Sequence, residues 1–155
     1  MSGSKLQKQD QLKLGLGLLH LTCNETQINQ LLNYLDLLER WNKAYNLTAI
    51  RDPFDMINLH LLDSLAISVE LQGDRFIDVG TGPGLPGIPL AIMNQNKNFT
   101  LLDSNGKKTR FLFQTKLELG LDNISEVNQR VQDFHPKKTY DCVLSRAFSS
   151  LGDMV

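Results

Sequence analysis

The sequence predicts an α/β protein in which a helical N-terminal part precedes a Rossmann-like parallel sheet. From residue 75 onward, short apolar runs alternate with segments of helical periodicity, the pattern of consecutive βαβ units. A glycine-rich turn directly follows the first of these runs, and upstream of it apolar residues recur every three or four positions. We therefore expect a helical extension at 1–72, packed on a Rossmann-like cofactor-binding core at 73–155.

Composition restricts the class of protein. The chain has 155 residues, 41% hydrophobic and 21% charged, with a net charge of −1, which suits one folded domain. No apolar run approaches the roughly 20 residues of a membrane span, and no secretory signal is visible. Cys23 and Cys142 are too few for a zinc cluster or a disulfide framework. We expect a cytoplasmic protein without a membrane anchor or metal, whose binding of nucleic acid would need a local basic face.

The N-terminal part contains two expected helices after a polar start. Residues 1–11 are predicted to form a flexible leader, and 12–21 a short apolar helix. Thr22 and Glu25 have the spacing of a capping box, which predicts that a helix begins there. The apolar residues that follow fall on one helical face: Ile28, Leu31, Leu32, Leu35 and Leu38. They predict an amphipathic helix.

A third helix is predicted to begin at Asp52, with Pro53 in its first turn. Its expected buried stripe is Ile57, Leu61, Leu62, Leu65, Ala66 and Val69. The predicted strands span 75–79, 99–103, 124–127 and 140–145, with helices at 85–93 and 106–119 and Gly120 as a helix stop. Because a doubly wound sheet normally continues further, we expect C-terminal strands to be missing from this sequence.

The glycine-rich turn predicts a cofactor site. Gly80, Gly82 and Gly84 lie between a strand and a helix, where glycine permits positive φ and a close approach of ligand to backbone. The segment from Gly82 also satisfies G-x-G-x-x-G, and Asp103 follows at the spacing of a nicotinamide dinucleotide site. A nicotinamide-dependent oxidoreductase is therefore one alternative.

Two features favour a different cofactor. Three prolines in and after the turn leave few amides for a pyrophosphate, and Asp78 places a carboxylate beside the turn, where a cation is accommodated better. S-adenosylmethionine carries an amino group and a sulfonium and no phosphate, so it fits. Asp103 ends the second strand, where it could accept ribose hydroxyls or cap the following helix, and both readings stay open. The segment 128–132 after the third strand is placed to contact an adenine through backbone groups.

Several segments resemble one known family, the ribosomal RNA small subunit methyltransferase G or glucose-inhibited division protein B family. The matching segments, in chain order, are Trp41-Asn-Lys-Ala-Tyr-Asn-Leu-Thr-Ala-Ile-Arg-Asp-Pro, His60-Leu-Leu-Asp-Ser-Leu, Asp78-Val-Gly-Thr-Gly-Pro-Gly-Leu-Pro-Gly-Ile-Pro-Leu, Leu102-Asp-Ser-Asn-Gly-Lys-Lys and Leu144-Ser-Arg-Ala-Phe-Ser-Ser-Leu. The resemblance implies a class I S-adenosylmethionine-dependent methyltransferase fold. It also implies methylation of the 7-position nitrogen of a guanosine in the 530 loop of 16S rRNA, within the small ribosomal subunit or its precursor.

The resemblance also implies site residues. The cofactor contacts carried over by motif are Gly80, Leu85, Val131, Gln132 and Arg146. The family often has Ala-Glu at the positions of Val131 and Gln132, so only a backbone contact there is expected to carry over.

Methylation at this ring nitrogen needs no general base, because an in-plane lone pair is already present. Orientation and exclusion of water are then the main requirements. We expect Arg146 to position the guanine as a forked donor, with a structural ion pair at the sheet edge as the alternative.

Basic residues of the helices predict contacts to RNA. The candidates are Arg40, Lys43, Arg51, Lys107, Lys108 and Arg110, with an ordinary solvated surface as the alternative for each. Trp41 is expected in the core. His60 and Asp63 lie one helical turn apart, and we expect a hydrogen-bonded structural pair rather than a substrate contact. The protein is expected to be a monomer, and a cofactor-binding or RNA-binding module without activity is the second alternative.

Overall fold

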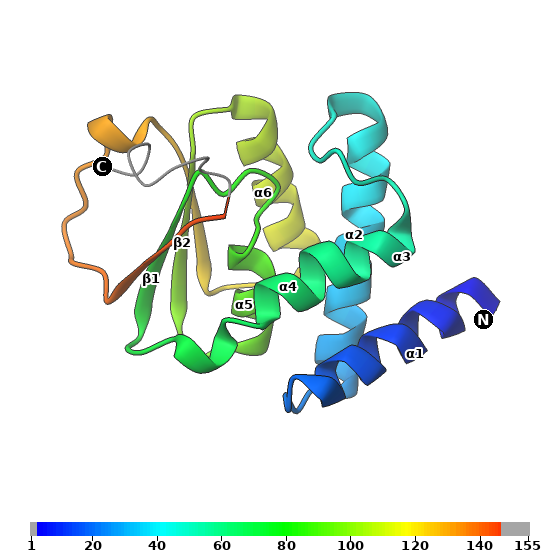
Figure 1. Cartoon of the computed structure of the whole chain (residues 1–155). Coiled ribbons are helices and arrows are strands. Elements are labelled where there is room, and N and C mark those ends of the chain that lie inside the picture. Colours follow the sequence, from blue (N-terminus) through cyan, green and yellow to red (C-terminus); the bar gives the residue numbers. More distant parts are fainter. Residues whose placement is uncertain (1–2, 147–155) are drawn as a thin grey trace.

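The fold is built on a four-stranded parallel sheet, in a computed structural model that describes residues 3–146 (Figure 1). The strand order is β3-β2-β1-β4, and every neighbouring pair is parallel. The strands are β1 Arg75–Val79, β2 Asn98–Asp103, β3 Ile124–Asn128 and β4 Cys142–Leu144. The predicted Rossmann-like sheet is confirmed, although β4 is shorter than the strand predicted at 140–145. The remainder of the expected core, residues 147–155, lies outside the described residues.

Two helices connect the first three strands. After β1 comes α5, Gly87–Met93, and after β2 comes α6, Gly106–Leu119. As predicted, α6 ends at Gly120, which takes a left-handed φ of 66°. The first helix begins two residues later than predicted, because Leu85 and Pro86 belong to the glycine-rich turn.

The N-terminal part packs against these helices as a second layer. It consists of α1 Gly3–Leu18, α2 Glu25–Tyr45, α3 Pro53–Met56, the π-helix η1 Ile57–Leu62 and α4 Asp63–Leu65. Of these, α2 contacts α5 and α6, while α3, η1 and α4 run on as one helix that α1 contacts (Figure 1). A 3-10 turn, η2 Ser68–Glu70, then leads to the sheet.

The predicted leader and first helix start are wrong. Helix α1 begins at Gly3 and includes most of the expected leader, because Leu12 and Leu16 on one of its faces are buried in the core. The cap of α2 is Asn24 rather than Thr22: its side-chain oxygen accepts from the Gln27 N–H at 2.8 Å, and Gln27 Oε1 accepts from the Asn24 N–H at 3.0 Å. Asn is a stronger N-cap than Thr, so the capping box forms two residues later.

The predicted helix start at Asp52 is confirmed, since the Asp52 side chain accepts a hydrogen bond from the Phe54 N–H at 2.8 Å. Its predicted stripe holds only in part. Ile57, Leu61 and Leu65 are buried, but Ala66 is exposed and Val69 is 76% exposed. The π-helical segment changes the angular spacing of side chains, and α4 ends at Leu65, so the periodicity does not continue.

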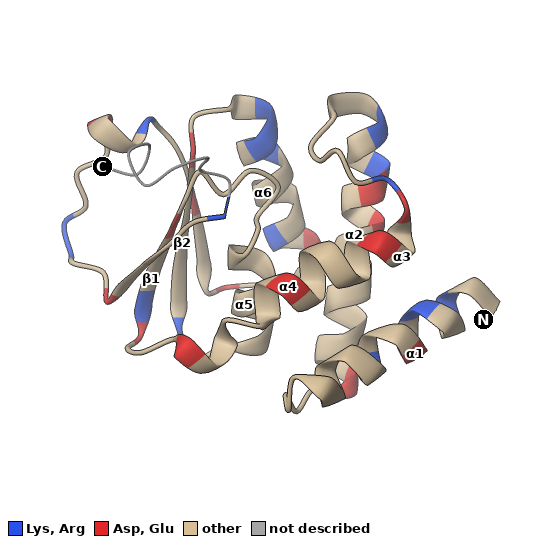
Figure 2. Ribbon diagram, in the orientation of Figure 1, with Lys and Arg blue, Asp and Glu red and all other residues tan. Residues whose placement is uncertain are grey.

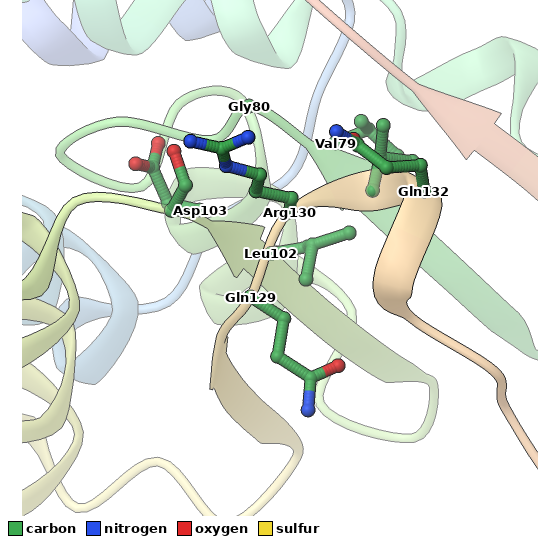
Figure 3. Close-up of a pocket in the computed structure, with 9 residues that line it drawn as sticks. Val79, Gly80, Leu102, Asp103, Gln129, Arg130 and Gln132 are labelled. Atoms are coloured by element: carbon green, nitrogen blue, oxygen red, sulfur yellow. The ribbon is translucent and has the colours of Figure 1, made fainter.

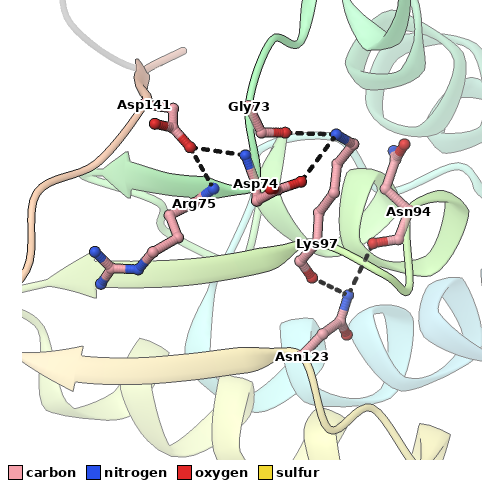
Figure 4. Close-up of polar contacts among 7 residues, drawn as sticks. All are labelled: Gly73, Asp74, Arg75, Asn94, Lys97, Asn123 and Asp141. Carbon is pink, nitrogen blue, oxygen red and sulfur yellow. Dashed lines mark hydrogen bonds and ion pairs between the residues drawn. The ribbon is translucent and has the colours of Figure 1, made fainter.

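Polar contacts fix the amino ends of the strands (Figure 4). The Asp141 carboxylate accepts from the backbone N–H groups of Asp74 and Arg75 at 2.7 and 3.0 Å, which lowers the pKa of this acid. The Asn123 amide donates to the carbonyls of Asn94 and Lys97. These contacts lie at the opposite end of the sheet from the glycine-rich turn, so we interpret them as structural.

Trp41 packs on the core as predicted, with its ring centroid 5.5 Å from that of Phe111. Within residues 3–146, no helix is both long and apolar enough to cross a bilayer. The same part of the chain has no cluster of three or more His, Cys, Asp or Glu residues arranged to hold a metal ion.

Candidate functional site

The glycine-rich turn is tied to the carboxyl end of β2. Gly80, Gly82 and Gly84 all have positive φ, at 67°, 59° and 98°. The N–H groups of Gly80 and Thr81 both donate to the Leu102 carbonyl, at 2.9 and 3.1 Å. The turn therefore bends back over the edge of the sheet at which ligands bind in open α/β folds.

Asp78 braces this turn from inside. Its Oδ2 accepts from the Thr81 hydroxyl at 2.7 Å and from the Gly87 N–H, at the start of α5, at 2.8 Å. The side chain is buried, and Oδ1 has no hydrogen-bond donor among residues 3–146. Burial raises the pKa of this carboxyl to about 7, against the lowering effect of the two hydrogen bonds. The carboxylate that we expected beside a ligand thus holds the turn against α5.

One cavity lies between the ends of β1 and β2 and the segment after β3 (Figure 3). It measures about 390 Å³ and is lined by Val79, Gly80, Leu102, Asp103, Ser104, Gln129, Arg130, Val131 and Gln132. Val131 and Gln132 belong to a 3-10 turn, η3 Val131–Asp133. Four of the predicted cofactor-binding residues are therefore brought together here from three separate segments. The side chains of Gln129 and Arg130 were not singled out by the sequence patterns.

Asp103 joins the turn to the start of α6. Its Oδ2 accepts from the Gly82 N–H at 2.8 Å, and its Oδ1 accepts from the Asn105 N–H at 2.9 Å. The helix cap itself is Asn105, whose side chain accepts from the Lys107 N–H at 2.9 Å. The capping alternative for Asp103 is therefore wrong. Each of its oxygens keeps lone-pair capacity at the cavity edge.

A second cavity shares Gly80 with the first. It measures about 310 Å³ and is lined by Leu47, Thr48, Gly80, Thr81, Gly82, Pro83, Leu85, Lys108 and Arg146. This cavity contains the predicted residues Gly82, Leu85 and Arg146. Gly84 lines neither cavity: a Cβ there would lie 2.5 Å from Ile88 Cδ1, so this glycine allows α5 to pack closely.

Arg146 connects the end of β4 with the helical layer. Its guanidinium donates to the Leu59 carbonyl at 2.6 Å and to Ser64 Oγ at 3.5 Å. The same group forms an ion pair with Asp63 at 3.5 Å. The structural pairing that we weighed as an alternative is present, but its partner lies on a helix rather than at the sheet edge.

His60 has a different partner from the one predicted. Its Nε2 lies 2.8 Å from Thr48 Oγ1, whereas Asp63 pairs with Arg146. The π-helical backbone turns His60 toward the loop that follows α2, and this rearrangement has no signal in the residue spacing. Burial, with the charge of Arg146, lowers the pKa of His60 to about 4.

The predicted basic residues lie mainly in the last turns of α2 and the first turns of α6, where Lys and Arg are coloured blue in Figure 2. Three belong to the first turns of α6, and Arg40 and Lys43 to the last turns of α2. Arg40 forms an ion pair with Glu118 at 3.7 Å, and Arg51 donates to Asn46 Oδ1 at 2.6 Å. The amine of Lys107 lies 5.7 Å from the Tyr45 ring centroid, and Lys108 lines the second cavity.

Comparison with known proteins identifies the family. The family model described as GidB, rRNA small subunit methyltransferase G, matches residues 27–155. Ribosomal RNA small subunit methyltransferase G of Vibrio atlanticus is 56% identical over 140 residues, which cover 90% of this chain and 67% of that protein. The Saccharophagus degradans protein of the same name is 59% identical over 137 residues, covering 88% of this chain and 61% of that protein.

This chain spans about two thirds of the length of these relatives. Among solved structures, coclaurine N-methyltransferase bound to N-methylheliamine and SAH aligns with a TM-score of 0.52 and 16% identity, covering 91% of this chain and 50% of that one. That likeness supports the fold, a class I methyltransferase sheet. The chain belongs to the rRNA small subunit methyltransferase G family.

Proposed function

We propose that this chain binds S-adenosylmethionine and methylates the 7-position nitrogen of a guanosine in the 530 loop of 16S rRNA. The observation that carries the proposal is the pair of cavities that share Gly80 at the carboxyl edge of the sheet. Family membership supports the reaction and the rRNA substrate.

The residues present fit this cofactor. In the first cavity, Asp103 would accept hydrogen bonds from ribose hydroxyls, and Leu102 and Val131 offer apolar contact to adenine. Gly80 and Gly82 have positive φ and carry no side chain, so the backbone between the two cavities stays open to a ligand. The space beside Gly82 is empty, since a Cβ there would meet nothing within 4 Å. In the second cavity, the Arg146 guanidinium suits the carboxylate of the cofactor's methionine part.

The start of α5 does not suit a pyrophosphate. Its Gly87 N–H already donates to Asp78, and the Ile88 N–H donates to the Gly84 carbonyl at 2.7 Å. Because a pyrophosphate at a helix start depends on free amides, this arrangement disfavours the nicotinamide alternative.

The reaction requires the protein mainly to place the two reactants. When bound, S-adenosylmethionine supplies a methyl group on a sulfonium, and the guanine nitrogen already presents its lone pair. The protein has to align the two and exclude water. No general base is needed, which agrees with the His60 Nε2 being engaged by the Thr48 hydroxyl rather than open to a substrate.

The basic residues of α2 and α6 are the proposed RNA contacts. Lys43, Lys107 and Arg110 are exposed, and Lys108, which lies between two of them on α6, lines the second cavity, so they would meet phosphates near it. We propose the small ribosomal subunit or its precursor as the form in which the rRNA is methylated.

Transfer of a labelled methyl group tests the proposal. The chain would be incubated with tritium-labelled S-adenosylmethionine and small subunits that lack the modification, and the rRNA digested to nucleosides. We expect the label in 7-methylguanosine, and none with the Gly80→Asp variant. Binding of S-adenosylhomocysteine without any transfer would contradict the enzyme and favour the non-catalytic module.

A further inference from the structure

We propose that Thr48 binds the methyl-accepting guanine and that His60 is the positioning residue that holds the Thr48 hydroxyl in place. The inference rests on the proposed function and assigns its base-binding residues. It is carried by the second cavity and by the hydrogen bonds that surround Thr48.

The position of Thr48 makes it available to a substrate. It belongs to the loop between α2 and α3 and lines the second cavity together with residues of the glycine-rich turn, Lys108 and Arg146. The turn residues Gly80 and Leu85 are the proposed contacts of the cofactor. Leu47 and Thr48 come from the helical layer instead, so they provide a separate part of the lining for the nucleobase.

Buried polar side chains hold Thr48 from two helices. Its backbone N–H donates to Oδ1 of the buried Asn42 at 2.9 Å, and its Oγ1 is 2.8 Å from Nε2 of the buried His60. Burial of polar groups is costly unless they are hydrogen-bonded. Two such groups converging on one cavity residue are typical of a preorganised binding site.

The hydroxyl of Thr48 has one hydrogen bond left to make. It accepts from the Ile50 N–H at 3.2 Å and is bonded to His60, while a hydroxyl forms three hydrogen bonds at most. The remaining hydrogen bond of this hydroxyl can be made to the edge of a guanine, which presents both donors and acceptors.

One helical segment orders both Thr48 and Arg146. The π-helix η1 carries His60, which bonds Thr48, and Leu59, whose carbonyl accepts from Arg146 at 2.6 Å. Short π-helical segments are frequent at functional sites, where they redirect side chains and backbone groups. Thr48 and Arg146, which line the cavity from outside the turn, are thus both set by adjacent positions of η1.

Steady-state kinetics of four variants test the inference. The variants are Thr48→Val, Thr48→Ser, His60→Leu and His60→Gln, with the exposed Thr26→Val as matched control. Thr48→Val should lower kcat/KM for the rRNA substrate by roughly tenfold, the effect of one lost hydrogen bond, and leave the Kd for S-adenosylhomocysteine unchanged. Thr48→Ser should restore kcat/KM, and His60→Gln should retain more of it than His60→Leu.

Native kcat/KM in Thr48→Val would overturn the inference while leaving the proposed function intact. If the unaltered chain itself makes no 7-methylguanosine, the proposed function fails. A binding measurement then tests separately whether Thr48 contacts the RNA. In that readout, an rRNA fragment containing the 530 loop should shift the imidazole nitrogen resonances of His60 in the unaltered chain but not in Thr48→Val. No shift in the unaltered chain would contradict a contact at Thr48.

Discussion

The Tyr34 hydroxyl donates a hydrogen bond to the Pro83 carbonyl at 2.7 Å, joining the middle of α2 to the glycine-rich turn. Tyr34 is fully buried, and burial raises the pKa of its phenol above the ordinary value. The N-terminal layer thus fixes the backbone of the turn that the proposed cofactor follows.

Replacing Tyr34 by Phe should therefore weaken both stability and cofactor binding. The change leaves the Pro83 carbonyl without its partner, which should lower the free energy of unfolding by about 1 to 3 kcal/mol. Urea denaturation and calorimetry with S-adenosylhomocysteine would measure the two effects. Tyr45→Phe is the control, because the Tyr45 side chain is 42% exposed. Equal effects of both substitutions would refute the role of the bond.

Gly80→Asp should abolish binding of S-adenosylhomocysteine. Gly80 has a φ of 67° and lines both cavities, so a side chain there is strained and fills the path between them. Gly17→Ala is a suitable control, since a Cβ at this position of α1 meets nothing within 4 Å. Calorimetry would show the loss, and micromolar binding by Gly80→Asp would disprove the proposed site.

Asp78→Asn should change how stability depends on pH. The pKa of Asp78 is about 7 in the folded chain and 3.8 in the reference state, so between these values the folded state holds a proton that the unfolded state has lost. The contribution of Asp78 to the free energy of unfolding is therefore largest below about pH 4, and it declines as the pH rises to about 7.

The stability of the unaltered chain relative to Asp78→Asn should therefore fall by a few kcal/mol over this interval. Asn keeps an oxygen that can accept from Thr81 and Gly87, so the turn should persist. Urea unfolding at several pH values would measure the difference, and a constant difference would contradict the raised pKa.

The sequence patterns predicted the sheet better than the contacts between layers. Apolar runs and glycines are local signals, which is why β1 and α6 have the bounds expected of them. Helix α1 lacks a strong apolar stripe and forms because Leu12 and Leu16 pack on the core, a contact that local spacing does not reveal.

Local sequence patterns likewise predicted only part of the candidate site. Gly80, Asp103 and Gln132 were found from motifs and do line a cavity. The bond from Tyr34 to Pro83 and the pairing of His60 with Thr48 were missed, since each joins segments whose approach depends on the tertiary fold. The π-helix at Ile57–Leu62 departs from ordinary α-helical spacing, so a prediction based on ordinary helical turns paired His60 with Asp63.

Neutralising the basic residues near the site should weaken RNA binding and spare the cofactor. In a chain with Lys43→Gln, Lys107→Gln and Arg110→Gln, the slope of log affinity against log salt should become shallower by roughly one per lost phosphate contact. A matched triple change of Lys8, Lys137 and Lys138 to Gln is the control. Filter binding with small-subunit rRNA would measure the slopes, and identical slopes would exclude these residues as phosphate contacts.

The central claim is that the glycine-rich turn holds S-adenosylmethionine, and calorimetric titration with S-adenosylhomocysteine, alongside NAD, tests it most directly. We expect saturable binding of one S-adenosylhomocysteine per chain and no heat of binding with NAD. Binding of NAD, or of neither compound, would contradict the assignment of the two cavities to this cofactor.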